Sequence, residues 1–137
     1  MIRHDNEARH DAALTPVTML AREVEGPDRA VIATDANGDV IYWGAGAEKM
    51  FGWSGAEVMG RAIVELTPSD LSRDLAQSIL TTLREGHPWS GEFSLRGKDG
   101  RRFEARVTDI PVHDSAGHLL GIVGISRRAG YIEAGGA

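Results

Sequence analysis

Three strand-length segments joined by tight turns fill the last third of the chain. Apolar and polar side chains alternate in residues 89–95 and again in residues 103–107, which is the two-residue period of a strand with one buried face. Residues 119–125 are almost continuously apolar, as a central strand is. Turn-forming residues separate these segments at 98–100 and 114–117. This pattern predicts an antiparallel sheet.

A β-hairpin is predicted nearer the start of the chain. Residues 30–34 and 40–43 are short apolar runs, and an Asn-Gly pair at 37–38 suits a turn that needs positive φ. A helix is expected before this hairpin, over residues 14–24, because apolar residues recur there at helical spacing. Pro16 fits the first position of that helix, where its missing N–H is harmless.

Helices are predicted between the hairpin and the last three strands. Two short ones are expected at 45–51 and 54–59, the second with a capping box at its start, and a single turn at 63–66. Residues 71–85 form the one long predicted helix. Its apolar side chains lie four positions apart and form one stripe opposite a charged face: Leu71, Leu75, Ile79 and Leu83.

The order of these elements predicts an α+β domain. We expect a five-stranded antiparallel sheet with the short helices and the long helix on one face, plus an N-terminal amphipathic helix. The expected organisation is a mobile tail at 1–13, a flanking helix at 14–26, the domain at 27–128 and a C-terminal tail at 129–137. A chain of 137 residues has the size of one domain.

Composition excludes several classes of protein. The net charge of -5 argues against binding to duplex nucleic acid. No stretch approaches the roughly 18 apolar residues that span a membrane, and the polar N-terminus is not a secretory signal, so a cytoplasmic location is expected. The chain contains no cysteine, which excludes disulfides, thiolate metal sites and cysteine nucleophiles.

With its elements in this order, the chain resembles the PAS family over residues 30–127. The resemblance rests on short motifs in the family's order and spacing: Ala33-Thr34-Asp35, Ile41-Tyr42-Trp43, Ala47-Glu48-Lys49-Met50-Phe51-Gly52-Trp53, Glu57-Val58-Met59-Gly60, Pro88-Trp89-Ser90-Gly91-Glu92, Lys98-Asp99-Gly100 and Gly121-Ile122-Val123-Gly124-Ile125-Ser126. Two departures concern Gly44, where many relatives have a helix-capping Asn, and Arg128-Ala129-Gly130, where many have a signalling motif.

The resemblance implies a sensory domain and no catalysis. Members of the family enclose a small cavity between the sheet and its covering helices, and they signal to an output domain or a partner protein through flanking helices. We therefore expect a module that binds a small ligand or mediates dimerisation. The expected lining side chains are Ile32, Thr34, Tyr42, Met50, Phe51, Trp89, Phe93, Leu95, Phe103 and Val107. A homodimer is expected through the N-terminal helix and a sheet face, with Leu14, Val17, Ala21 and Val24 in the contact.

Cofactor and enzyme alternatives follow from the same residues. The light-sensing branch of the family needs a reactive cysteine, which is absent, and haem-binding members commonly use a histidine on the long helix, where this chain has none. The cofactor is thus unknown, haem is not expected, and a redox sensor with non-covalent flavin remains an alternative. A histidine-kinase fragment is the alternative from the enzyme class. His10 lies six residues before Pro16, and this stretch faintly resembles the phospho-acceptor box of histidine kinases. His113, Asp114 and His118 are interpreted as a solvated turn and not as a metal site.

Overall fold

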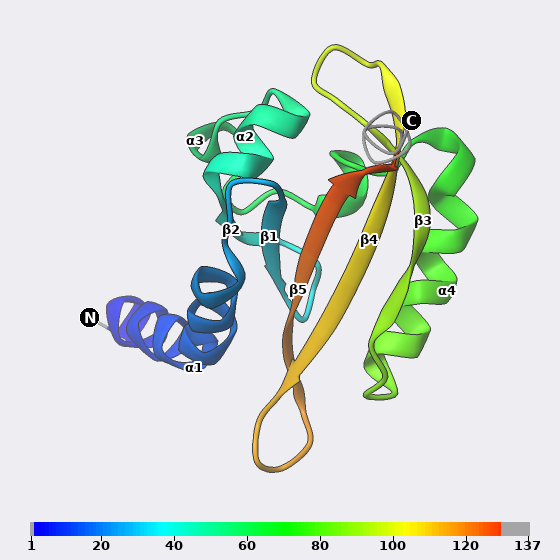
Figure 1. The fold of residues 1–137 in the computed structure, drawn as a ribbon. Coiled ribbons are helices and arrows are strands. Elements are labelled where there is room, and N and C mark those ends of the chain that lie inside the picture. The colour runs from blue at the N-terminus through cyan, green and yellow to red at the C-terminus, as the bar shows by residue number, and fades with distance from the viewer. Residues whose placement is uncertain (1, 130–137) are drawn as a thin grey trace.

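Five strands form one antiparallel sheet in the order β2-β1-β5-β4-β3 (Figure 1). The computed structural model describes the backbone of residues 2–129 and the side chains of residues 12–129. The strands are β1 (Ala30–Asp35), β2 (Val40–Trp43), β3 (Trp89–Arg96), β4 (Arg102–His113) and β5 (Leu119–Arg128). β1 and β5 pair at the centre of the sheet although they come from opposite ends of the chain.

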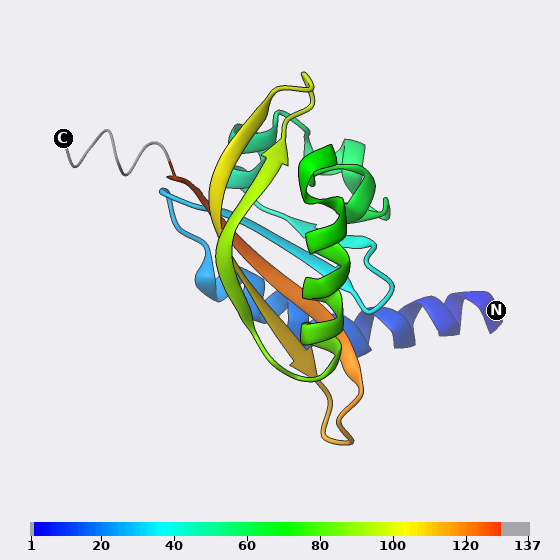
Figure 2. The same ribbon diagram turned by 90° about the vertical axis from the view of Figure 1, so that its right-hand side faces the viewer.

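Helices lie on both faces of this sheet (Figure 2). The helices are α1 (Ile2–Val24), α2 (Ala45–Phe51), α3 (Gly55–Val58) and α4 (Arg73–Arg84), with single 3-10 turns η1 (Ile63–Glu65) and η2 (Asp70–Ser72). α4 and the short helices cover one face, which we call the inner face, and α1 covers the other, the outer face. The α+β architecture predicted from the sequence is confirmed.

An aspartate stabilises each of the three hairpin turns. Asp35 Oδ1 accepts hydrogen bonds from the N–H groups of Asn37 and Asp39, and Asp114 Oδ1 accepts from those of Ala116 and His118. Asp99 Oδ1 accepts one from Arg101 N–H in the same way. Such local bonds favour a tight turn over a longer strand, so they fix where the strands end.

α1 begins earlier than predicted. Residues 2–13, which we expected to form a mobile tail, belong to this helix. Good helix formers such as Ala12 and Ala13 continue the helix on the N-terminal side, so Pro16 lies inside it and not at its first position. Residues 130–137 of the predicted C-terminal tail lie outside the described residues.

The long helix also starts differently. Residues 70–72 form η2, and α4 begins only at Arg73. Of the predicted apolar stripe, Ile79 and Leu83 are buried against the inner face, whereas Leu71 is 70% exposed and Leu75 is 40% exposed. Leu71 leaves the stripe because it lies in a 3-10 turn, which rotates successive side chains by a different angle from an α-helix. Leu75 lies in the first turn of α4 and faces solvent.

Candidate ligand cavity

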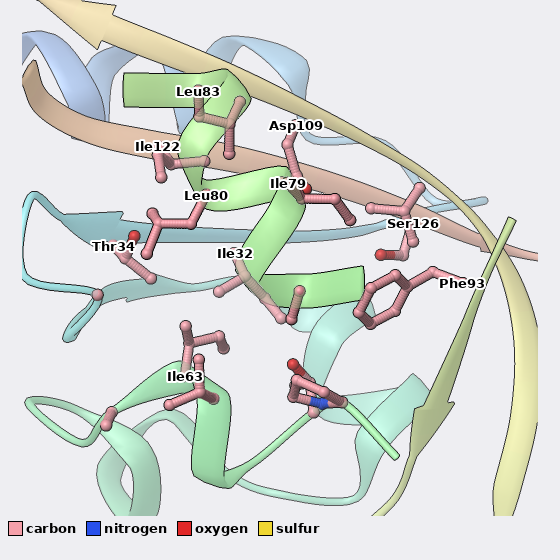
Figure 3. A pocket seen from close by; sticks show the side chains of 18 of the residues that line it. Ile32, Thr34, Ile63, Ile79, Leu80, Leu83, Phe93, Asp109, Ile122 and Ser126 are labelled. Atoms are coloured by element: carbon pink, nitrogen blue, oxygen red, sulfur yellow. The ribbon is translucent and has the colours of Figure 1, made fainter. Parts of the chain in front are cut away.

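A cavity of about 200 Å³ lies between the inner face of the sheet and the covering segments α4 and η1 (Figure 3). Its surface is mostly apolar. The lining side chains and backbone come from every strand but β2: Ile32, Thr34, Asn37, Gly38, Phe51, Ala62, Ile63, Val64, Thr67, Pro68, Ala76, Gln77, Ile79, Leu80, Leu83, Phe93, Val107, Asp109, Ile122, Gly124 and Ser126.

The alternation of strand residues decides which side chains face the cavity. Ile32 of β1 pairs with Gly124 of β5, and Gly124 pairs with Asp109 of β4, so these three positions form one row across the sheet. Residues two positions away on each strand point to the same face. Thr34, Ile122, Ser126 and Val107 therefore line the cavity beside that row.

α4 and η1 form the wall opposite the sheet. Ile79 and Leu83 of α4 are almost fully buried, and Leu80 lies beside them with its side chain toward the cavity (Figure 3). Ile63 of η1 approaches from the other side. Since a small domain normally packs its interior to crystal-like density, a void of this size between packed layers is a specific feature of the molecule.

One side of the cavity is open to solvent. Asn37, Val64 and Gln77 line it and are themselves exposed. They come from the β1–β2 turn, η1 and α4, so the opening lies where these three segments meet. A small molecule could enter here without unfolding of the sheet.

Asp109 is the one ionisable side chain in this lining. Burial alone raises the pKa of its carboxyl from 3.8 to about 7. The surface that Asp109 retains faces the cavity, so the side chain is partly accessible and yet surrounded by protein. Two buried hydroxyl groups, those of Thr34 and Ser126, add further polar contacts. An apolar cavity with a few such polar groups is the usual composition of a ligand site.

The structure brings five of the ten expected lining residues to this cavity: Ile32, Thr34, Phe51, Phe93 and Val107. Four others lie in the same inner-face core without lining the cavity: Met50, Trp89, Leu95 and Phe103. These four side chains pack in the apolar core beside the cavity. The ring centroids of Phe103 and Phe51 lie 5.7 Å apart. The guanidinium carbon of Arg128 lies 4.1 Å from the ring centroid of Phe103.

The prediction that Tyr42 lines the cavity is wrong, because Tyr42 lies on the outer face of the sheet. It packs with the outer-face cluster, and its hydroxyl donates a hydrogen bond of 2.9 Å to Glu25 Oε1 at the end of α1. Burial, together with that carboxylate, raises the pKa of the Tyr42 hydroxyl to about 12. Tyr42 therefore anchors α1 to β2 and does not orient a ligand in this cavity.

The four side chains expected at a dimer contact pack on the chain's own sheet. Val17 and Ala21 have no exposed surface, and Leu14 is 8% exposed. Val24 packs at the edge of the same cluster. Leu14, Val17 and Ala21 are buried in the cluster with Val31, Ala33 and Val123 of the outer face, so these three have almost no surface left for a second copy.

The polar clusters singled out in the sequence are solvated. Asp114 Oδ2 lies 3.3 Å from His118 Nδ1 at an exposed turn. Among the side chains at positions 12–129, no three His, Cys, Asp or Glu residues are grouped closely enough to hold a metal ion. The side chain of His10 lies outside the described residues.

The sequence analysis expected covering helices but named neither Asp109 nor any residue of α4 among the lining side chains. Residues Phe103, Ala105 and Val107 were assigned to one alternating strand, and Asp109 continues their parity, so it had to share their face if the strand continued. The alternation was followed only as far as Val107, whereas β4 continues to His113. Among the residues that the structure describes, no helix is long and apolar enough to cross a membrane.

Comparisons with known proteins agree with this architecture. A family model described as the PAS fold matches residues 18–129. Human high affinity cAMP-specific and IBMX-insensitive 3',5'-cyclic phosphodiesterase 8A is 24% identical over 121 residues, which make up 88% of this chain and 15% of that protein. Two-component system protein A of Emericella nidulans is 30% identical over 102 residues, or 73% of this chain and 15% of that protein.

A solved structure shows the same fold. The crystal structure of a PAS domain of a Colwellia psychrerythraea protein superimposes with a TM-score of 0.71 at 21% identity, covering 82% of this chain and 95% of that one. Since this chain spans only 15% of each relative described above, the likeness concerns one domain of those proteins and not their whole activity. The matched family model covers most of the chain, and the chain therefore belongs to the PAS family.

Proposed function

We propose that this domain is a sensory module that binds a small, compact ligand in the cavity and relays its presence to an output domain or partner protein. The observation that carries the proposal is the cavity of about 200 Å³ between the inner face and α4, because it combines an apolar wall, a few polar groups and an opening. A relative named as a two-component system protein supports a role in signalling.

The size of the cavity favours a single-ring ligand. Typical sites for drug-sized ligands have about 300–1,000 Å³, whereas an engineered apolar cavity of about 150 Å³ in another protein binds benzene. The cavity here lies between these values and nearer the second. Non-covalent flavin, with three fused rings, is the alternative within the same class, and an absorption spectrum of the purified protein would separate the two.

Binding and relay, and not catalysis, is the role we assign to this domain. The lining offers one ionisable side chain, Asp109, whereas acid–base or nucleophilic catalysis generally needs two cooperating groups in reach of the substrate. Phosphorylation of the chain when it is incubated with ATP would instead favour the kinase-fragment alternative.

The relay would run through β5 to α1. Ile122 lines the cavity, and its neighbour Gly121 faces α1 on the other side of the same strand. A Cβ atom at position 121 would lie 3.1 Å from both methyl carbons of Val17. A ligand that moves β5 would therefore also shift the α1 side chains that pack on this strand. A homodimer remains a prediction. Because most of the apolar stripe of α1 is buried on the chain's own sheet, the two copies would have to meet mainly through other surfaces.

A cavity-filling variant tests the proposal. Ala76 of α4 lines the cavity, so Ala76→Phe should occupy the space of a ligand, whereas Ser78→Phe places the same side chain on the exposed side of the same helix. Benzyl alcohol, benzylamine and benzoate serve as single-ring probes. We expect at least one probe to raise the melting temperature of the wild type and of Ser78→Phe but not of Ala76→Phe.

Native mass spectrometry of the same three proteins gives the second readout. A bound small molecule in the wild type and in Ser78→Phe, but not in Ala76→Phe, would support a ligand in the cavity. Absence of any adduct and of any probe-dependent stabilisation in the wild type would contradict the proposed ligand binding.

A further inference from the structure

The carboxylate of Asp109 has no hydrogen-bond or ion-pair partner among the described residues. Asp35, by contrast, is buried and its Oδ1 accepts hydrogen bonds from two backbone N–H groups. An unpaired carboxyl group deep in a protein is costly, and the cost falls only if the group becomes protonated or gains a donor. Asp109 lines the cavity, so a ligand can supply that donor.

Gly124 allows the carboxylate to reach the cavity. The two residues are paired across β4 and β5, and Asp109 Oδ1 lies 2.9 Å from the place where a Cβ atom at position 124 would be. The side chain of Asp109 thus extends over the bare backbone of β5 toward the middle of the inner face (Figure 3). Ser126 is the next residue of β5 on that face, so its hydroxyl borders the same space.

Nothing charged opposes or neutralises Asp109 within the cavity. The lining side chains of β1, β3, β5, η1 and α4 are all neutral, among them Ile32, Phe93, Ser126 and Gln77. In agreement with this, burial is the sole cause of the raised pKa of Asp109, with no contribution from a neighbouring charge.

We propose that the cavity is selective for a small organic cation, a compound with a compact apolar body and a protonated amine or amidine that pairs with Asp109. This inference rests on the proposed function and names the ligand class for the same cavity. The ammonium or amidinium group donates hydrogen bonds to the Asp109 carboxylate and the Ser126 hydroxyl. The apolar body contacts the aliphatic side chains of α4 and β5.

The chemistry of the lining favours a cation over the other compounds that would fit. An anionic ligand would place a second negative charge beside a buried carboxylate. A neutral apolar ligand would leave Asp109 unpaired after displacing any water around it. A charge-assisted hydrogen bond between a cation and a carboxylate is roughly twice as strong as a neutral one. Water alone would hydrate the carboxylate but would find few polar partners along the mostly apolar wall.

Three single-ring probes of similar size separate these possibilities in the full chain. Benzylamine is cationic at neutral pH, benzyl alcohol is neutral and benzoate is anionic, and each carries one ring. We expect the wild type to bind benzylamine roughly tenfold or more tightly than benzyl alcohol, and benzoate most weakly, by isothermal titration calorimetry.

Asp109→Asn removes the charge while keeping the shape of the side chain. It should abolish the preference for benzylamine over benzyl alcohol and leave benzyl alcohol binding within a few-fold of the wild type. Glu104→Gln, which removes an exposed charge from the same strand, is the matched control and should keep the preference.

The pH dependence of binding is a readout that a merely structural role of Asp109 would not change. Benzylamine needs the ionised carboxylate, and the pKa of Asp109 in the empty cavity is about 7. Affinity should therefore rise about tenfold between pH 6 and pH 8 in the wild type, and stay flat in Asp109→Asn.

The outcomes distinguish this inference from the proposed function. Equal binding of benzylamine and benzyl alcohol, or an unchanged preference in Asp109→Asn, would overturn the assignment of a cation while leaving a ligand cavity in place. Binding of none of the three probes to the wild type would overturn both.

Discussion

At the scale of single residues, the position of Asp109 is what distinguishes this domain from an ordinary packed core. Its neighbours across the sheet are Gly124 on β5 and Trp89 on β3, and neither offers a charged partner. Apolar surroundings disfavour the ionised form of an acid, which is why the pKa of Asp109 is raised to about 7. The folded protein therefore holds a proton at pH values where the unfolded chain has released it.

Asp109 should make stability fall as pH rises. Between its ordinary pKa of 3.8 and its folded value of about 7, the folded state binds more protons than the unfolded state, so this residue's contribution is full below pH 3.8 and is lost as pH rises through 7. At about 1.4 kcal/mol per pKa unit, the loss amounts to a few kcal/mol. Asp109→Asn should thus gain stability relative to the wild type from pH 4 to pH 7 and then level off. Urea denaturation at pH 4, 5, 6, 7 and 8 measures this difference, and an unchanging difference would contradict a buried, protonated Asp109.

At the scale of elements, local signals in the sequence were sufficient for the hairpins and the short helices. The capping box of Ser54 and Glu57 forms as predicted at the start of α3, and the turn between β1 and β2 lies at Asn37-Gly38. Such elements depend on neighbouring residues, which the sequence shows directly. Which face of β2 carries Tyr42, and where α4 leaves a void, depend on partners distant in the chain. Periodicity gives two faces for a strand without stating which is inner.

Two glycines on opposite faces of β5 provide a matched pair of variants. A Cβ atom at position 121 would lie 2.2 Å from the backbone oxygen of Thr34, which cannot easily move, so Gly121→Ala should destabilise the protein by about 1–3 kcal/mol. At position 124 the nearest atom belongs to the movable side chain of Asp109, 2.9 Å away. Gly124→Ala should therefore cost less stability but displace the carboxylate and reduce the preference for benzylamine. Thermal denaturation and calorimetry of both variants test this, and equal destabilisation would contradict it.

At the scale of the whole molecule, α1 acts as the second layer of the fold. The sheet is covered by α4 and the short helices on the inner face and by α1 on the outer face, so each face contributes its own buried cluster. The sequence revealed the amphipathic stripe of α1 but not the surface that it packs against, because such a stripe fits the chain's own sheet or a second copy equally well. The complete burial of Val17 and Ala21 assigns it to the sheet.

Removal of α1 should therefore expose an apolar sheet face and promote self-association. Deleting residues 1–26 uncovers Val31, Ala33 and Val123, which are at most 1% exposed beneath the helix. We expect a lower melting temperature and, by light scattering over a range of concentrations, a larger mass than that of the full chain, because exposed apolar patches drive association. Met19→Glu, on the exposed side of α1, is the control for a change in this helix that leaves the sheet covered. A truncated protein that stayed monomeric with an unchanged melting temperature would show that α1 contributes little to the fold, and a truncation that dissociated a dimer of the full chain would show that the helix itself holds two copies together.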